Sequence, residues 1–195
     1  MIKVNLVVLV SIAVFCLTAC SDEPKSASTP GGVVTESQVQ GDRSVAISTS
    51  VAKVNTESIV KADPKNWLST GRTYDEQRHS PLKQINDTNI SELGLAWSWE
   101  TNTKRGLEST PIVVDGIMFN SGTWSTVWAH DARTGEILWE FDPEVPRSWG
   151  RYACCDVVNR GVAAWEGKIF VGTIDGRLIA LNAGDGTIAW SVKTT

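Results

Sequence analysis

The feature that most constrains the fold of this chain is an internal repeat. Residues 111–141 align with residues 162–192 without a gap, at a constant offset. The coinciding positions are turn and apolar residues, where two copies of one fold would agree. They are Gly116 with Gly167, Phe119 with Phe170, Ala129 with Ala180, Gly135 with Gly186, Ile137 with Ile188, and Trp139 with Trp190.

Each copy has the pattern of four short strands. Asp115-Gly116 separates two apolar runs in the first copy, and Glu166-Gly167 does so in the second. Such a dipeptide is typical of a tight hairpin, because both turn residues must accept a positive φ. A second turn follows at Thr134-Gly135 and at Asp185-Gly186. Four short strands in about 50 residues predict one blade of a β-propeller, and the many β-branched residues and turn glycines exclude a helical solenoid.

A tryptophan lies at the same place in the last strand of each copy. Burying such a side chain removes about 200 Å² from water, which at about 25 cal/mol per Å² contributes on the order of 5 kcal/mol before entropy. We therefore expect Trp139 and Trp190 to dock each blade on its neighbour, the alternative being unrelated surface tryptophans. Residues 94–99, Gly-Leu-Ala-Trp-Ser-Trp, predict one further strand of this kind, in an incomplete blade.

The run Ala129-x-Asp131-x-x-Thr134-Gly135-x-x-x-Trp139 resembles the tryptophan-docking motif of the eight-bladed quinoprotein propellers. The second copy has Asn182 and Asp185 at two motif positions, which keeps the turn chemistry. The resemblance implies an all-β fold over residues 63–195: a partial eight-bladed β-propeller, with about two blades and an incomplete one. Eight blades of about 50 residues need about 400, so we expect a truncated reading frame or a fragment.

Two adjacent cysteines, Cys154 and Cys155, are the sharpest local feature. In an oxidising compartment they favour a vicinal disulfide, a strained ring that distorts the intervening peptide. Two reduced cysteines in a sheet are the alternative. Pairing elsewhere lacks partners, because Cys16 is expected to be removed with a signal peptide and Cys20 to be lipidated.

Residues 153–161, ACCDVVNRG, resemble the segment of pyrroloquinoline quinone (PQQ)-dependent methanol and ethanol dehydrogenases that packs a vicinal disulfide on one face of the quinone. The resemblance implies that Arg160 reaches the quinone oxygens, which suits a planar, permanently charged guanidinium. Residues 106–111 resemble the segment whose glutamate contacts the cofactor, which implies that role for Glu108. The alternatives are a surface arginine in a loop and a solvated acid.

The family resemblance also implies a reaction. In the complete enzymes calcium polarises the quinone, an aspartate takes the alcohol proton, hydride passes to the quinone, and electrons leave to a cytochrome-type acceptor. The calcium ligands and the catalytic aspartate lie later in that family, so we expect no catalytic residue and no metal ligand in this chain, and no turnover by it. Its two histidines, His79 and His130, form no zinc-type cluster or haem-attachment motif, and a phosphate-binding glycine loop is missing from the sequence.

A non-enzymatic protein is the alternative from another class. Outer-membrane assembly lipoproteins share PQQ-like repeats and serve as scaffolds without quinone, and fold alone does not separate the two. The adjacent cysteines, Arg160 and Glu108 favour the dehydrogenase, because a scaffold has no use for a strained disulfide beside a guanidinium.

The N-terminus has the pattern of an exported lipoprotein. An apolar run over residues 6–17 is shorter than the roughly 20 residues that span a bilayer, which predicts a secretory signal peptide over residues 1–19. Leu17-Thr18-Ala19-Cys20 matches a lipobox, so we expect lipidation of Cys20 and a membrane anchor; a plain signal peptide is the alternative. Ser21, by resemblance to such lipoproteins, favours the periplasmic side of the outer membrane.

Residues 20–62 lack aromatic side chains and are rich in Ser, Thr, Val, Gly and Lys. Such a composition buries little apolar surface, which predicts a disordered tether after the lipidated cysteine; a folded β segment around residues 45–54 is the alternative. The formal net charge of −4 argues against nucleic acid as a partner.

Overall fold

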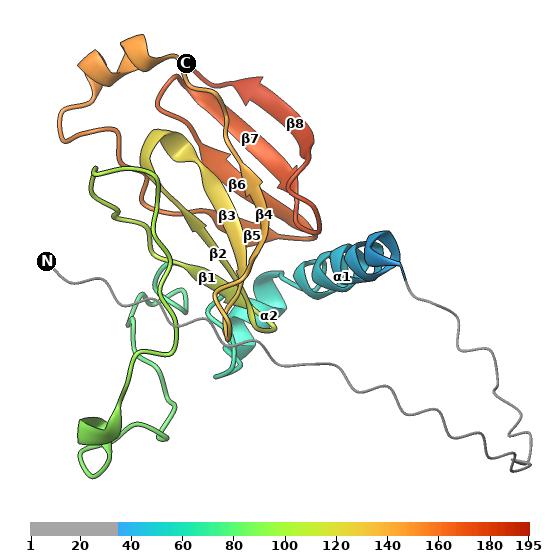
Figure 1. The fold of residues 1–195 in the computed structure, drawn as a ribbon, viewed down its shortest axis with the longest axis vertical. Helices are drawn as coiled ribbons and strands as arrows, with labels where there is room; N and C mark the ends of the chain where they lie inside the picture. Colours follow the sequence, from blue (N-terminus) through green and yellow to red (C-terminus); the bar gives the residue numbers. More distant parts are fainter. Residues whose placement is uncertain (1–34) are drawn as a thin grey trace, which may run out of the picture. The chain divides into compact units, whose positions relative to one another are not determined.

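The computed structural model describes residues 35–195. The predicted signal peptide, Cys20 and Ser21 lie outside these residues. The described part contains two four-stranded antiparallel sheets, each with its strands in chain order (Figure 1). The first sheet consists of β1 (Ile112–Val114), β2 (Ile117–Ser121), β3 (Val127–Asp131) and β4 (Ile137–Phe141). The second consists of β5 (Ala163–Trp165), β6 (Lys168–Gly172), β7 (Arg177–Asn182) and β8 (Ile188–Lys193). The predicted all-β blades are confirmed.

The two sheets repeat each other in detail. The hairpin turns have positive φ at both central residues, 47° and 82° at Asp115-Gly116 and 41° and 83° at Glu166-Gly167. Ala129 pairs with Trp139, and Ala180 pairs with Trp190. Each sheet has its register shift directly after that alanine. A turn, a cross-strand pair and an irregularity therefore recur at the spacing of the sequence repeat.

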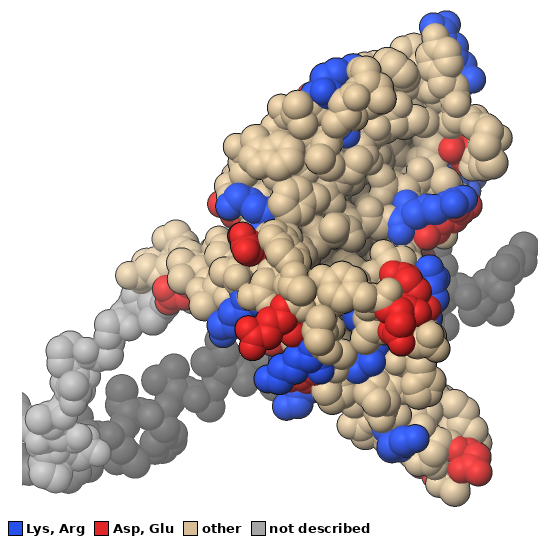
Figure 2. Space-filling view, turned by 180° about the vertical axis from the view of Figure 1, so that it is seen from behind, with Lys and Arg blue, Asp and Glu red and all other residues tan. Residues whose placement is uncertain are grey.

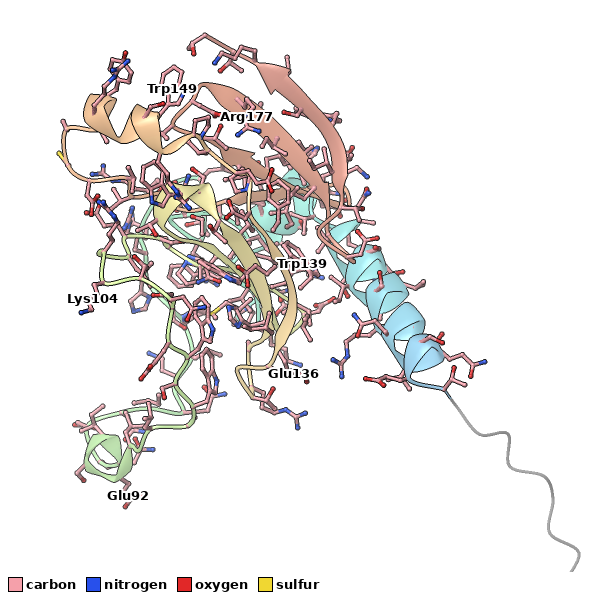
Figure 3. All side chains as sticks on the ribbon, turned by 45° about the horizontal axis from the view of Figure 1, so that its top comes forward. Glu92, Lys104, Glu136, Trp139, Trp149 and Arg177 are labelled. Carbon is pink, nitrogen blue, oxygen red and sulfur yellow. The ribbon has the colours of Figure 1, made fainter. Side chains whose placement is uncertain are left out.

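Trp139 joins the first sheet to the second. Its indole Nε1 donates to the carbonyl of Ala183, 2.9 Å away, and its side chain is 8% exposed. A Cβ on Gly186 would lie 2.6 Å from the indole ring, and this glycine has a φ of 73°. A side chain at residue 186 would therefore be strained and would displace the tryptophan. Figure 3 shows Trp139 on β4 facing the second sheet.

Trp97 makes the same contact with the first sheet. Its Nε1 donates to the carbonyl of Ala132 at 3.1 Å, and a Cβ on Gly135 would lie 2.6 Å from its ring. Residues 94–99 thus occupy the position of a fourth strand, although they pair with no strand of the described chain. Trp190 on β8 is 43% exposed, in a strand whose residues are all exposed.

The structure differs from the predicted tether over residues 36–61. Helix α1 (Glu36–Val51) and helix α2 (Thr56–Lys61) occupy this segment, each beginning with a capping box. The helices and the turn between them bury four apolar side chains in the core shared with both sheets: Ile47, Val51, Val54 and Ile59. The prediction was wrong because it weighed average composition. A few apolar residues at helical spacing, with caps, suffice when a blade supplies the other side of the core.

The helical segment is also hydrogen-bonded to the second blade. The amides of Glu166 and Gly167 in the β5–β6 turn donate to the carbonyls of Val54 and Val51, at 2.9 and 3.1 Å. No helix among residues 35–195 combines the length and apolarity needed to cross a membrane.

Replacing Val51 by alanine tests whether α1 belongs to the folded core. Val51 is fully buried, so we expect Val51→Ala to lower the free energy of unfolding by about 2 kcal/mol. Val45 lies on the same helix and is 67% exposed, so Val45→Ala is expected to cost less than about 0.5 kcal/mol. Urea unfolding followed by tryptophan fluorescence measures both. Equal effects would show that α1 does not pack on the blades in solution.

A partly buried ion pair provides a second link between the blades. Arg177 on β7 pairs with Asp175, 2.8 Å between Nη2 and Oδ2, and also donates to the carbonyl of Pro143, which follows β4. Thr173 donates to the same carboxylate. Burial acts to raise the pKa of Asp175, but the hydrogen bonds from Arg177 and Thr173 outweigh it and hold the pKa below its ordinary value.

The lowered pKa of Asp175 predicts acid sensitivity. The unfolded chain takes up the proton at a higher pH than the folded chain, so the stabilisation is complete above about pH 4 and is lost as the pH falls further. We expect Asp175→Asn to be less stable than wild type at pH 7 and to lose less stability between pH 5 and pH 3. Thermal unfolding across this range measures the difference, with Asp115→Asn in an exposed turn as the control. Parallel pH profiles for wild type and Asp175→Asn would contradict the prediction.

Candidate functional site

The connection between the two blades carries three of the four predicted cofactor contacts. It runs from β4 through the 3₁₀ segment η3 (Arg147–Tyr152) to β5 and contains Cys154, Cys155 and Arg160. The fourth predicted residue, Glu108, lies in the segment that leads into β1. The amide of Thr110 donates to the carbonyl of Arg160 at 3.1 Å, which places the two segments side by side. The structure therefore brings all four residues together.

Arg160 and Glu108 form an ion pair on the surface. Nε of Arg160 lies 3.3 Å from Oε2 of Glu108, and the two side chains are 79% and 45% exposed. An ion pair this exposed contributes little to folding, because water and salt screen it. Both the guanidinium and the carboxylate are exposed enough to contact a ligand.

The two cysteine side chains are exposed beside this pair. Their sulfurs lie 2.6 Å apart and are unbonded in the structure, and no peptide bond among residues 35–195 is cis. The vicinal disulfide stays a prediction. The pKa of Cys155 is raised, mainly by its hydrogen bond to Cys154, while Arg160 acts to lower it and Glu108 to raise it. The four side chains are thus within electrostatic reach of one another.

Asn159 fixes the backbone beneath Arg160. Its Oδ1 accepts from the hydroxyl of Ser121 at 2.6 Å, and its Nδ2 donates to the carbonyl of Gly172 at 2.9 Å. Ser121 ends β2 and Gly172 ends β6, so one amide side chain joins both sheets. Sequence reasoning assigned no role to Asn159, because its partners Ser121 and Gly172 lie on strands far from it in the chain.

Gly161 completes the turn after Arg160. Its amide donates to Oδ1 of Asn159, its φ is 136°, and a Cβ there would lie 3.0 Å from the carbonyl of Thr110. A glycine is needed for this conformation and for the close approach of the two segments.

A cavity adjoins the two residues that follow the cysteines, Asp156 and Val157. It has a volume of about 460 Å³, and its walls are Arg105, Trp124, Arg147, Gly150, Asp156 and Val157. The guanidinium carbon of Arg147 lies 4.3 Å from the centre of the Trp124 ring, and that of Arg105 lies 5.8 Å from it. Sequence reasoning missed this cluster, because its members come from three separated segments without a common motif.

The remaining titratable groups give no sign of a metal centre in the described part. Among residues 35–195, no three His, Cys, Asp or Glu side chains are grouped so that they could hold an ion. His130 is fully buried against Trp97 and Trp99, and burial lowers its pKa despite a hydrogen bond with the carbonyl of Gly135. His130 is therefore a core residue.

Charges of both signs mix on the surface. Over the described residues visible in Figure 2, acidic and basic side chains lie side by side.

The comparisons with known proteins agree with the fold. The family model described as "PQQ: Glucose/ethanol/alcohol dehydrogenase, beta-propeller domain" matches residues 67–191. Quinohemoprotein alcohol dehydrogenase ADH-IIG of Pseudomonas putida is 57% identical over 145 residues, 73% of this chain and 20% of that protein. The 1-butanol dehydrogenase (cytochrome c) of Thauera butanivorans is 53% identical over 128 residues, 66% of this chain and 18% of that protein.

A solved structure gives the same result. The crystal structure of quinohemoprotein alcohol dehydrogenase from Comamonas testosteroni superposes with a TM-score of 0.75 and 47% identity, over 78% of this chain and 23% of that chain. The chain spans about a fifth of the length of the curated relatives that it matches. With more than half of its residues matched by the family model, the chain belongs to the PQQ-dependent glucose, ethanol and alcohol dehydrogenase family, of whose β-propeller it supplies two blades.

Proposed function

We propose that this chain is part of a PQQ-dependent dehydrogenase that oxidises alcohols, and that Glu108, Arg160, Cys154 and Cys155 contact the quinone. The observation that carries the proposal is that these four side chains lie together on one exposed surface. Glu108 precedes the first blade in the sequence and Arg160 follows it. The identity to alcohol dehydrogenases, 57% for the relative from P. putida, supports it.

The donor set fits a flat quinone. Two exposed sulfurs offer a polarisable surface on which a ring can lie, and Arg160 offers several N–H donors at its edge. Because the guanidinium is mostly exposed and Glu108 is its one ion-pair partner within residues 35–195, it can turn toward quinone oxygens without breaking a buried contact. The ion pair with Glu108 then keeps the guanidinium beside the quinone, so that it does not rotate away into solvent.

When bound, PQQ would supply the hydride- and electron-accepting chemistry of the reaction. This chain contributes binding and charge: Arg160 favours negative charge on the quinone oxygens, and the cysteine turn covers one face of the ring. Calcium ligands and the proton-accepting aspartate are proposed to lie in the remaining part of the propeller. We propose a cytochrome-type acceptor, as the name of the Thauera butanivorans relative suggests.

A chimera tests the proposal. Residues 67–191 of this chain would replace the aligned segment of the P. putida relative, so that the propeller is complete. With PQQ and calcium, we expect this chimera to reduce a dye in the presence of a primary alcohol, and to do so only when PQQ is added. A chimera that folds like the unmodified relative but oxidises no alcohol would exclude a functional quinone site in this segment.

We also propose that the chain is exported and anchored by lipid on the periplasmic face of the outer membrane. Leu17-Thr18-Ala19-Cys20 supports this. Labelled palmitate is expected in the wild-type chain produced in a bacterium, and the label is expected to be lost in Cys20→Ala. Cys16→Ala is the control, because that cysteine precedes the cleavage site. Equal labelling of all three proteins, or of none, would contradict lipidation at Cys20.

A further inference from the structure

We infer that Arg105 and Asp156 are positioning residues, which hold the Cys154–Cys155 turn so that both sulfurs face the proposed quinone surface; this inference rests on the proposed function. Asp156 follows the two cysteines directly and has a φ of 70°, a backbone conformation that is uncommon outside glycine but that aspartate adopts more readily than most residues. Its side-chain contacts show how this turn is attached to the rest of the chain.

The carboxylate of Asp156 is held from two sides. Its Oδ1 accepts from the amide of Val157 at 2.8 Å and from the guanidinium of Arg105. Arg105 comes from the segment that also carries Glu108, three residues later. One ion pair thus attaches the cysteine turn to the segment that supplies the fourth proposed quinone contact.

Trp124 holds the other end of the same turn. Its amide donates to the carbonyl of Val157 at 2.9 Å, and Val157 is buried, with 3% of its surface exposed. Trp124 and Ser125 both have positive φ, 60° and 63°, in a turn between β2 and β3. The guanidiniums of Arg105 and Arg147 both lie over the Trp124 ring, with their carbons 5.8 and 4.3 Å from its centre.

These contacts leave one face of the turn free. Asp156 is paired with Arg105 and Val157 is buried, while the side chains of Cys154 and Cys155 are exposed. Arg105 also forms an ion pair with Asp156 of the turn, whereas Arg147 forms no ion pair within residues 35–195. Arg147 is therefore a matched control with the same charge on the same ring.

The test is the thiol–disulfide equilibrium of the cysteine pair in the 195-residue chain, without quinone. The chain is equilibrated with defined ratios of reduced and oxidised glutathione, alkylated and weighed by mass spectrometry. Arg105→Ala is expected to shift the equilibrium toward two thiols by about two- to fivefold, the size expected of a half-exposed ion pair. Arg147→Ala is expected to leave it unchanged, and Arg105→Lys to restore part of the shift.

A merely structural role for Arg105 would not be sensitive to charge. At 1 M salt we expect the wild-type equilibrium to approach that of Arg105→Ala, which itself stays constant. Asp156→Asn keeps the turn conformation and the bond from Val157 but loses the charge, so the double variant Arg105→Ala/Asp156→Asn should add little to either single change. Equal shifts in Arg105→Ala and Arg147→Ala, or fully additive effects, would overturn the inference.

If the two cysteines stay reduced at every glutathione ratio, the rate of hydrogen exchange at the Val157 amide tests the positioning role of Arg105 instead. It is expected to be at least about twofold faster in Arg105→Ala than in Arg147→Ala, and equal rates would overturn the inference. Both measurements exclude quinone, so a chimera that fails to bind PQQ while Arg105→Ala shifts the cysteine pair would refute the proposed function and leave the positioning role standing.

Discussion

Replacing Trp139 by alanine is expected to lower the free energy of unfolding by about 3–5 kcal/mol. The indole is almost fully buried between the blades, packs against Phe119 at 5.8 Å between ring centres, and donates to the carbonyl of Ala183. Its loss leaves a cavity between the sheets and an unpaired buried carbonyl, so packing and hydrogen bonding fail together. Urea unfolding followed by far-ultraviolet circular dichroism measures the change.

The second copy of the repeat supplies the control. Trp190 has the same cross-strand alanine and packs against Phe170 at the same 5.8 Å, but it lies 43% exposed on β8. Trp190→Ala is therefore expected to cost about 1 kcal/mol in this chain. If both substitutions cost the same, the tryptophan acts within its own blade, and docking between blades does not account for its energy.

In the chimera, Arg160→Ala is expected to raise the PQQ concentration required for half-maximal alcohol-dependent dye reduction by about 10- to 100-fold. A hydrogen bond to a charged group is worth about 1.5–3 kcal/mol, and each 1.4 kcal/mol is tenfold in affinity. Glu108→Gln should give a smaller increase, because it loosens the guanidinium without removing it.

Arg151→Ala is the matched control for Arg160. Arg151 is also exposed, on η3, and its guanidinium lies over the Tyr152 ring at 4.7 Å. We expect the PQQ requirement of this variant to equal that of the unsubstituted chimera. A similar loss for Arg151→Ala and Arg160→Ala would mean that PQQ responds to general positive charge near the site.

Periodic features of the blades could be predicted from the sequence because they rest on local chemistry. Asp115-Gly116 and Glu166-Gly167 require positive φ, and a tryptophan at a fixed distance after each turn glycine implies a fixed partner. The meeting of Glu108 with Arg160 followed only from family resemblance, because no local pattern relates residues that far apart in the chain.

Other features could not be predicted because they depend on tertiary contacts. Helix α1 has sparse apolar residues and is stabilised by the blades that it packs on, which composition alone does not reveal. Nothing in the sequence distinguishes Asn159 from other polar residues, because its role comes from hydrogen bonds to the ends of β2 and β6. Trp124 with its two arginines likewise becomes a cluster only when three segments meet.

Equilibrium titration of PQQ absorbance with the purified chimera, in the presence of calcium, is the most direct test of quinone binding by this segment. The four side chains Glu108, Cys154, Cys155 and Arg160 are claimed to form one surface of the quinone site. We expect a saturable spectral change at about one quinone per chain, which is lost in a folded variant with Ala at residues 108 and 160 and Ser at residues 154 and 155. A variant without these four side chains that binds PQQ as tightly as the unsubstituted chimera would contradict the account.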